Sequence, residues 1–284
     1  MSAPLRDGAP SGDGPSSGRL QPREVRAMFD RIAGVYDLMN GAMTAGLHHR
    51  WRQRAADLAR VGPGSRVLDL ATGTGDLALE LARRVTPGGE VVGADFAEAM
   101  LARARAKAAR ADASQVRPRF EWADAMQLPY PDASFDAATV GFGARNFEDL
   151  ERGLGEMVRV VRPGGRVVVL EITTPTRPPL SLFYRVWFER LIPALGRMAG
   201  VIAARAGHAP GAAGAPGGAG VHAEAGAGTI AQAYTYLPNS VKRFPGPAAL
   251  AAVLARAGLS RIRYLITAGG IVAIHAGTVP GERA

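Results

Sequence analysis

The 284-residue sequence predicts an α/β fold in which helices cover both faces of a mostly parallel sheet. From Arg66 onward, short runs rich in β-branched and aromatic residues alternate with Ala-, Leu- and Arg-rich stretches, which is typical of βαβ units. The composition agrees, because 47% hydrophobic and 21% charged residues suffice to bury an ordinary core. The length suits one large domain, which we place at 21–284.

Five runs are expected to form the parallel strands, and several of them end in an acidic or small residue. In an open α/β sheet, ligands bind beyond the carboxyl ends of the strands. We therefore expect the side chains of Asp69, Asp95 and Asp124, together with Gly141, to face one crevice. The runs are RVLDL at 66–70, EVVGAD at 90–95, RPRFEWAD at 117–124, FDAATVGF at 135–142 and RVVVLEI at 166–172.

Further elements are expected on both sides of these strands. Two helical patterns, at about 22–36 and 48–60, would form a lid or substrate wall over the strand ends. Residues 180–202 read as an amphipathic helix pair broken at Pro193. The chain would then end with a helix at 247–257 and two strands, near 261–266 and 270–275, added to the sheet as an antiparallel pair.

Two segments are predicted to lack regular structure. Residues 1–20 are rich in Pro, Gly and Ser and are interpreted as a disordered tail. Residues 203–228 contain 11 Ala and 8 Gly with only two charges, Arg205 and Glu224. Too few large apolar side chains are present there to offset the entropy of ordering, so a flexible insertion is predicted.

Charge and composition restrict the classes of partner. The 34 Lys+Arg exceed the 25 Asp+Glu to give a net charge of +9, but the basic residues are dispersed, so no nucleic-acid partner is predicted. A mild attraction to anionic membrane surfaces stays open. The absence of cysteine excludes disulfides, thiolate nucleophiles and Cys-ligated metals, and no metal site is predicted. Lacking an uncharged apolar run long enough to span a bilayer, the protein is expected to be soluble and cytoplasmic.

A glycine-containing turn joins the first strand to a helix in VLDLATGTGDLALELA. Gly73 and Gly75 let a ligand approach the backbone, and a helix beginning near Asp76 presents free N–H groups. The same letters satisfy G-x-G-x-x-A, and Asp95 lies 20 residues beyond Gly75, as a ribose-binding acid would in a dinucleotide site. An NAD-dependent oxidoreductase is therefore a serious alternative.

Two features favour S-adenosylmethionine over a dinucleotide. Asp69 lies just before the glycines, where its charge would repel a pyrophosphate but attract an amino group or a sulfonium. Asp124 could accept a hydrogen bond from an adenine amino group while the backbone N–H of Ala125 donates to the ring. Each acid alone could be an ordinary turn or capping residue, but three acids ending three successive strands favour cofactor binding.

Beyond these features, the sequence resembles the ubiquinone and menaquinone biosynthesis C-methyltransferase family over roughly residues 27–278. The motifs that carry the resemblance follow one another in the family's order and spacing. They are FDRIAGVYDLMN, GLHHRW, VLDLATGTGD, ADFAEAM, DAMQLPYPDASFD, FGARN and RVVRPGGRVVVLE.

The resemblance implies a Rossmann-like class I S-adenosylmethionine-dependent methyltransferase with N-terminal lid helices. It also implies C-methylation of a polyprenylated quinol ring, converting demethylmenaquinol to menaquinol, with the benzoquinol step of ubiquinone biosynthesis as the alternative. Carried over position by position, Thr74, Asp95, Asp124 and Ala125 would bind the cofactor. The family often has Ser where this chain has Gly141, so a side-chain contact is lost there or replaced by backbone.

The chemistry of such a reaction points to polar helpers near the substrate. A sulfonium methyl needs an electron-rich carbon, and a quinol carbon ortho to a phenolate is one. Because a phenolic hydroxyl titrates near pH 10, its deprotonation needs assistance. His48 has a suitable pKa for a base, and Arg145 could stabilise the phenolate directly or through water. Tyr36 and Asn146 complete the candidate catalytic set.

Each of these helpers also has a purely structural interpretation. Tyr36 could belong to a packed turn and His48 could simply start a helix, while Arg145 and Asn146 could cap a helix from Phe147. A protein without catalytic activity, a basic adaptor on this fold, is disfavoured by the intact acids and glycines.

The predicted partners follow from the substrate. Phe183, Tyr184, Trp187 and Phe188 form an aromatic stripe that more often belongs to a core but could line a groove for an isoprenoid tail. A tailed substrate also implies transient contact with a membrane surface, peripheral at the inner face of the cell membrane. A homodimer is left open.

Overall fold

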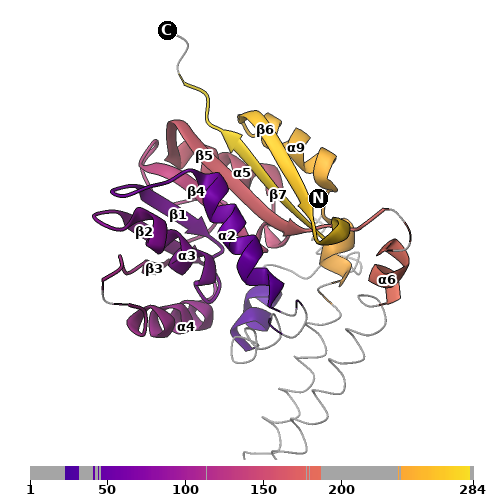
Figure 1. The fold of residues 1–284 in the computed structure, drawn as a ribbon, viewed down its shortest axis with the longest axis horizontal. Helices are drawn as coiled ribbons and strands as arrows, with labels where there is room; N and C mark the ends of the chain where they lie inside the picture. The colour runs from indigo at the N-terminus through magenta and orange to yellow at the C-terminus, as the bar shows by residue number, and fades with distance from the viewer. Residues whose placement is uncertain are drawn as a thin grey trace, which may run out of the picture.

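The computed structural model describes residues 23–31, 41, 44, 46–112, 114–176, 178, 180–186, 236 and 238–281. The predicted tail at 1–20, Tyr36 and the predicted insertion at 203–228 lie outside these residues, as do Trp187 and Phe188 of the aromatic stripe. What is described forms one seven-stranded sheet flanked by helices (Figure 1).

The sheet is parallel except at its C-terminal edge. Its strand order is β3-β2-β1-β4-β5-β7-β6, and β7 pairs antiparallel with both β5 and β6. This confirms the predicted mostly parallel sheet closed by an antiparallel pair. The strands are β1 (Arg66–Leu70), β2 (Glu90–Asp95), β3 (Arg119–Trp122), β4 (Phe135–Gly141), β5 (Val161–Ile172), β6 (Ser260–Thr267) and β7 (Val272–Thr278).

Helices cover both faces of the sheet and pack apolar side chains against it. Leu154 of α5 and Leu254 of α9 belong to one buried cluster, whereas Leu81 of α3 and Leu101 of α4 belong to the cluster on the other face. The helices are α2 (Leu47–Ala59), α3 (Asp76–Val85), α4 (Glu98–Ala109), α5 (Leu150–Val160), α6 (Leu180–Val186) and α9 (Pro247–Arg256), with 3-10 turns η1 (Ala144–Asn146) and η3 (Ala268–Gly270).

Residues 23–31 are also helical, and α2 begins one residue before the predicted position. The third strand is shorter than predicted, ending at Trp122, so Asp124 lies in the loop that follows and forms an isolated bridge with Gln127. No helix in the described part of the chain is long and apolar enough to cross a membrane.

Glycine is required in the turn that leads from β1 into α3. Gly75, at the start of α3, has φ +83°, and a Cβ added to it would lie 2.8 Å from Cζ of Phe120. A Cβ on Gly93 of β2 would lie 2.5 Å from Cδ1 of the same ring. Phe120 of β3 therefore packs over two bare backbone positions, and a side chain at either one would push this ring away.

Candidate active site

A cavity of about 420 Å³ opens beyond the carboxyl ends of β1, β2 and β4. Most of the residues predicted to bind a cofactor line it, so the structure brings together residues that the sequence separates by up to 72 positions. Those that line the cavity are Asp69, Gly73, Thr74, Asp95, Asp124, Ala125 and Gly141. Gly75 is not among the lining residues, and what the structure shows for it is the turn and the packing against Phe120.

Asp69 lies within β1 and is almost completely buried. The hydroxyls of Thr72 and Thr139 each donate to one of its carboxylate oxygens at 2.7 Å. Burial raises the pKa of Asp69 to about 6, although these two hydrogen bonds and the charge of Arg52 hold it down in part. The strand end therefore holds an oriented carboxylate that is charged at neutral pH and protonates in mild acid.

Asp95, the last residue of β2, shapes the glycine loop. One carboxylate oxygen accepts from the backbone N–H of Gly73 at 2.8 Å, and the other accepts from Ala97 at 2.9 Å. Burial raises the pKa of Asp95 to about 6, and the backbone hydrogen bonds oppose that rise. A carboxylate can accept about four hydrogen bonds, so with Gly73, Ala97 and Phe96 as donors it retains capacity for a ligand hydroxyl.

The start of α3 is surrounded by an ionic network. The ammonium of Lys107 donates to Thr74 at 2.9 Å and to Asp76 at 2.7 Å, and Arg52 approaches Asp76 to 3.3 Å. Although burial acts to raise it, the two cations bring the pKa of Asp76 below its ordinary value. The first turn of α3 is therefore fixed by charged contacts from α2 and α4.

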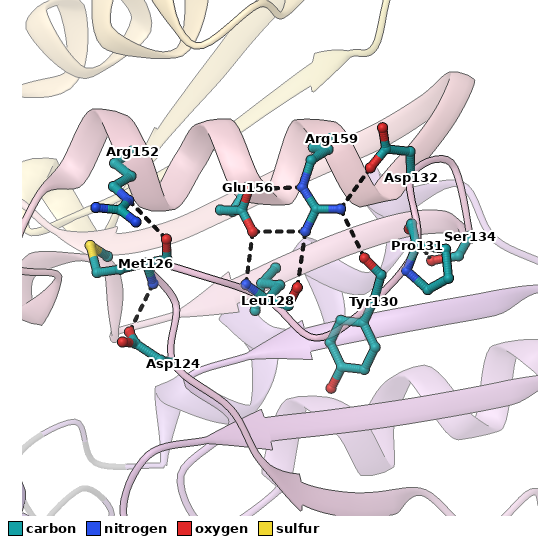
Figure 2. A network of polar contacts seen from close by, with 10 residues as sticks. All are labelled: Asp124, Met126, Leu128, Tyr130, Pro131, Asp132, Ser134, Arg152, Glu156 and Arg159. Carbon is teal, nitrogen blue, oxygen red and sulfur yellow. Dashed lines mark hydrogen bonds and ion pairs between the residues drawn. The ribbon is translucent and has the colours of Figure 1, made fainter.

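The loop that carries Asp124 and Ala125 is fixed to α5 by charged side chains (Figure 2). Arg159 donates to the carbonyls of Tyr130 at 2.8 Å and Leu128 at 3.0 Å, and pairs with Glu156 at 2.7 Å. The Glu156 carboxylate in turn accepts from the N–H of Leu128 at 2.7 Å.

Nearer the cavity, Arg152 donates to the Met126 carbonyl at 2.9 Å, and the Asp124 carboxylate accepts from the Met126 N–H at 2.8 Å. The loop therefore holds its exposed acid and the adjacent backbone in place before any ligand binds. This is the arrangement an adenine edge would require.

Residues 23–31 contribute to the wall of the cavity, as predicted for a lid helix. Arg23, Arg26 and Phe29 line the cavity. The Asp30 carboxylate accepts from the N–H of Ala99 at 3.1 Å and so binds a free amide at the start of α4. The Phe29 ring packs edge-on against that of Phe96, with centroids 6.5 Å apart.

Among the predicted catalytic residues that the structure describes, Asn146 lines the cavity. It ends η1, the 3-10 turn that follows β4. Its side-chain oxygen accepts from the hydroxyl of Tyr236 at 3.0 Å. Tyr236 also packs beside Met28 and Met100, so one aromatic side chain links the 23–31 helix, α4 and Asn146.

Arg145 lies beside Asn146 but is not among the residues that line the cavity. Its guanidinium pairs with Glu171 of β5 at 2.9 Å and donates to the carbonyl of Phe142, and both charged side chains are more than nine-tenths buried. The backbone N–H of Arg145 also donates to Glu171, at 3.2 Å. The structure thus shows an ion pair that holds η1 on β5, and the predicted contact with a phenolate stays a prediction.

His48 is buried on the first turn of α2 and does not line the cavity. Its Nδ1 contacts Arg52, which does. Its predicted role as a base therefore stays a prediction, and the geometry that the structure shows is a link to Arg52. Of the aromatic stripe, Tyr184 is 2% exposed and lies in the core.

Sequence reasoning missed Arg52, Lys107 and Tyr236. The first two carry no local signal, because an Arg or Lys within a helix is usually solvated. Tyr236 follows the predicted insertion and lies 90 residues from its partner Asn146. The fold places Arg52 in the cavity lining and brings Lys107 and Tyr236 into contact with the lining residues Thr74 and Asn146.

Comparison with known proteins identifies the family. The profile of the ubiE/COQ5 methyltransferase family matches residues 18–204 and 227–279. The chain belongs to this methyltransferase family. The interruption of the match, at 205–226, falls inside the Ala- and Gly-rich stretch at 203–228.

Members of the ubiE/COQ5 family with curated names cover nearly the whole chain. The demethylmenaquinone methyltransferase of Thermus thermophilus is 48% identical over 89% of this chain and 100% of its own length. That of Deinococcus radiodurans is 41% identical over 94% and 96% of the two chains. A ubiquinone/menaquinone biosynthesis C-methyltransferase of Geobacter sulfurreducens is 37% identical over 89% and 87%.

Solved structures share the fold with this family member at low identity. A SAM-dependent methyltransferase of Aquifex aeolicus superposes with a TM-score of 0.54 at 14% identity, covering 92% of this chain and 100% of that one. One of Thermotoga maritima gives 0.55 at 16%, covering 88% and 99%. These matches identify the fold, and the predicted Rossmann-like methyltransferase architecture is confirmed.

Proposed function

We propose that this protein transfers the methyl group of S-adenosylmethionine to a ring carbon of demethylmenaquinol, giving menaquinol. The observation that carries the proposal is one cavity lined both by the strand-end carboxylates Asp69, Asp95 and Asp124 and by the polar side chain of Asn146. The curated name of the Thermus relative supports the choice of quinol. The benzoquinol step is the second candidate, supported by the name of the Geobacter relative.

The residues of the cavity suit S-adenosylmethionine. Two buried carboxylates, Asp69 and Asp95, give the strand ends a negative character that suits an amino group, hydroxyls and a positively charged sulfur. Gly73, with φ +55° and no atom within 4 Å of an added Cβ, leaves open space at the turn. When bound, S-adenosylmethionine supplies an electrophilic methyl group on sulfur.

On the substrate side, Asn146 is oriented by its neighbour. Because its side-chain oxygen accepts from Tyr236, its NH₂ group remains available to donate toward a quinol oxygen. A donor at that oxygen stabilises the developing phenolate and so lowers the barrier to attack from the ortho carbon. Arg145 and Glu171 hold the turn that presents Asn146.

The proposal includes transient contact with a membrane surface, since the substrate carries an isoprenoid tail. On α6, Leu182 and Val186 are four residues apart, on one side of the helix, and are 58% and 41% exposed. Exposed apolar side chains of this kind suit the interface of a bilayer.

A quinone profile tests the function directly. The gene for this protein is introduced into a bacterium that lacks its own demethylmenaquinone methyltransferase, and lipid extracts are analysed by mass spectrometry. We expect menaquinone to reappear as demethylmenaquinone declines, with an Asp95→Ala version as the inactive control. Accumulated demethylmenaquinone in cells that contain the folded protein would overturn the proposal.

A further inference from the structure

A second cleft, of about 560 Å³, lies at the amino ends of the parallel strands, whereas the candidate active site lies beyond their carboxyl ends. Its lining includes Ser65, just before β1, Asp136 near the start of β4, and Thr278 at the end of the antiparallel β7. The proposed methylation uses none of these residues. We call this cleft the basic cleft because of the side chains that line it.

Arginine is concentrated in the basic cleft. Five of its 13 lining residues are arginines, whereas the composition of the whole chain would place about one or two there. Asp136 is the acidic residue among those that line it. The five are Arg60 after α2, Arg162 and Arg166 of β5, and Arg261 and Arg263 of β6.

Few of these positive charges are neutralised. Arg162 pairs with Asp136 at 2.8 Å, and the second oxygen of Asp136 accepts from the backbone N–H of Arg66 at 2.6 Å. Within the described residues, the side chains of Arg60, Arg261 and Arg263 form no ion pair or hydrogen bond, so the cleft retains an excess of positive charge.

Arg166 is partly buried among the arginines of the basic cleft. One guanidinium nitrogen donates to the hydroxyl of Thr278 at 3.0 Å, while its Nε is buried without a hydrogen-bond partner in the described part of the chain. Burial lowers the pKa of Arg166, and the charges of Arg60 and Arg263 lower it further. The charges of Arg60 and Arg263 therefore repel that of Arg166, and an anion bound among these side chains would relieve that repulsion.

We propose that the basic cleft binds a soluble anion of the diphosphate or triphosphate class. Guanidinium groups bind phosphate oxygens through paired, charge-assisted hydrogen bonds, and several converging arginines suit a ligand with several negative charges. The size of the cleft is in the range of small-molecule sites. The choice of a soluble ligand over a bilayer rests on the proposed function. A membrane bound at the basic cleft would hold the candidate active site, at the other end of the strands, away from the lipid that contains a tailed quinol.

Inorganic pyrophosphate is the probe, and titration calorimetry at low salt measures its binding to the full-length protein. The test variant is Arg60→Gln with Arg263→Gln, since both side chains are exposed and lie outside the catalytic and cofactor residues. The control is Arg103→Gln with Arg110→Gln, which removes the same charge from exposed positions at α4. We expect pyrophosphate to bind the wild type, at least about tenfold more weakly to the cleft variant, and nearly unchanged to the control.

The measurement needs neither S-adenosylmethionine nor a quinol, so its failure is distinguishable from failure of the proposed function. Absence of pyrophosphate binding to the wild type, or an equal loss in the control variant, would overturn the proposal. Parallel arms use vesicles of phosphatidylglycerol and phosphatidylcholine and a short single-stranded oligonucleotide. If the cleft substitutions weakened either of these while pyrophosphate did not bind, the cleft would belong to a membrane or nucleic-acid contact and the proposal would be wrong.

Discussion

The two sides of the cavity are built in different ways. On the proposed cofactor side, the Asp95 carboxylate accepts from the backbone N–H of Gly73 in the glycine loop and from that of Ala97 before α4, and Arg159 fixes the loop that carries Asp124. On the substrate side, the wall is assembled from residues 23–31, α2, η1 and Tyr236. The cofactor side is thus held by contacts within successive βαβ units, whereas the substrate side depends on contacts between distant parts of the chain.

This difference predicts which substitutions affect one property alone and which affect turnover and folding together. A change on the cofactor side should weaken S-adenosylmethionine binding while substrate affinity is retained. A change on the substrate side should alter turnover and the fold together, because the same contacts hold the wall in place.

The largest effect is expected at Arg145. Replacing it by Ala leaves Glu171 buried without its cation, which should cost about 3–5 kcal/mol of stability. Turnover should fall at least about tenfold, with a smaller loss for Arg145→Lys. Denaturant unfolding and single-turnover kinetics measure the two effects.

An exposed pair serves as the control for Arg145. The side chains of Arg256 and Glu151 are 57% and 49% exposed, so Arg256→Ala should cost less than about 1 kcal/mol. If Arg145 also stabilises the phenolate, raising the pH toward about 10 should partly restore the Ala variant. A stable and fully active Arg145→Ala protein would contradict both roles.

Asp95→Ala should have the next largest effect. It removes the acceptor for Gly73 and Ala97 and the predicted ribose contact, so S-adenosylmethionine binding should weaken by about 1.5–3 kcal/mol. Titration calorimetry measures this, and Asp112→Ala, at an acid outside the cavity lining, should leave the affinity unchanged. Unchanged affinity in a folded Asp95→Ala protein would show that the ribose assignment is wrong.

The pH dependence tests the same carboxylates without substitution. Burial raises the pKa of both Asp69 and Asp95 to about 6, so both are charged above pH 7 and protonate below pH 6. Affinity for S-adenosylmethionine should therefore fall as the pH drops through about 6. Titrations across pH 5–8 check this, and constant affinity over that range would argue against carboxylate recognition.

The raised pKa values of Asp69 and Asp95 affect folding stability in the opposite direction to cofactor binding. The pKa of each group is raised in the folded state, so the folded state holds protons more tightly than the unfolded chain. Their contribution to stability is full below the unfolded pKa and is lost as the pH rises through about 6. Weaker binding at pH 5 would therefore not come from unfolding caused by these two groups.

A smaller effect is expected at Arg159, which lies outside the cavity lining. Arg159→Gln breaks its contacts with the Leu128 and Tyr130 carbonyls and with Glu156, so the loop should be less well ordered. We expect binding of S-adenosylmethionine to weaken by about 1 kcal/mol. Arg152→Gln, which removes one carbonyl contact, should weaken it less, and equal effects would mean that the loop network is not what positions the cofactor side.

The smallest effect is expected from deleting residues 203–228 and joining the flanks with a short linker. The stretch is Ala- and Gly-rich, and the family match omits 205–226 within it. Affinity for S-adenosylmethionine should be nearly unchanged, although substrate affinity could change. Calorimetry on the deletion protein measures both, and loss of cofactor binding in a folded protein would contradict the separation between the two sides.

The sequence predicts well which residues line the proposed cofactor side, because short motifs determine their positions. A strand, a glycine turn and a helix place Asp69, Gly73 and Asp95 at one edge of a parallel sheet, and the family motifs agree. The orientation of Arg145 toward Glu171 was not predictable in this way. It depends on how η1 packs on β5, which no strand, turn or helix pattern in the sequence specifies. Tyr236 escaped detection for the same reason.

Single-turnover methyl transfer by the purified protein tests the central claim most directly. The protein is mixed with S-adenosylmethionine that carries a labelled methyl group and with a short-tailed demethylmenaquinol, and the product is analysed by mass spectrometry. The account predicts that the label appears on a ring carbon, that Asp95→Ala needs more S-adenosylmethionine to reach the same rate, and that Arg145→Ala stays slow at saturating cofactor. Label on a quinol oxygen, or no transfer by a protein that binds S-adenosylmethionine, would contradict it.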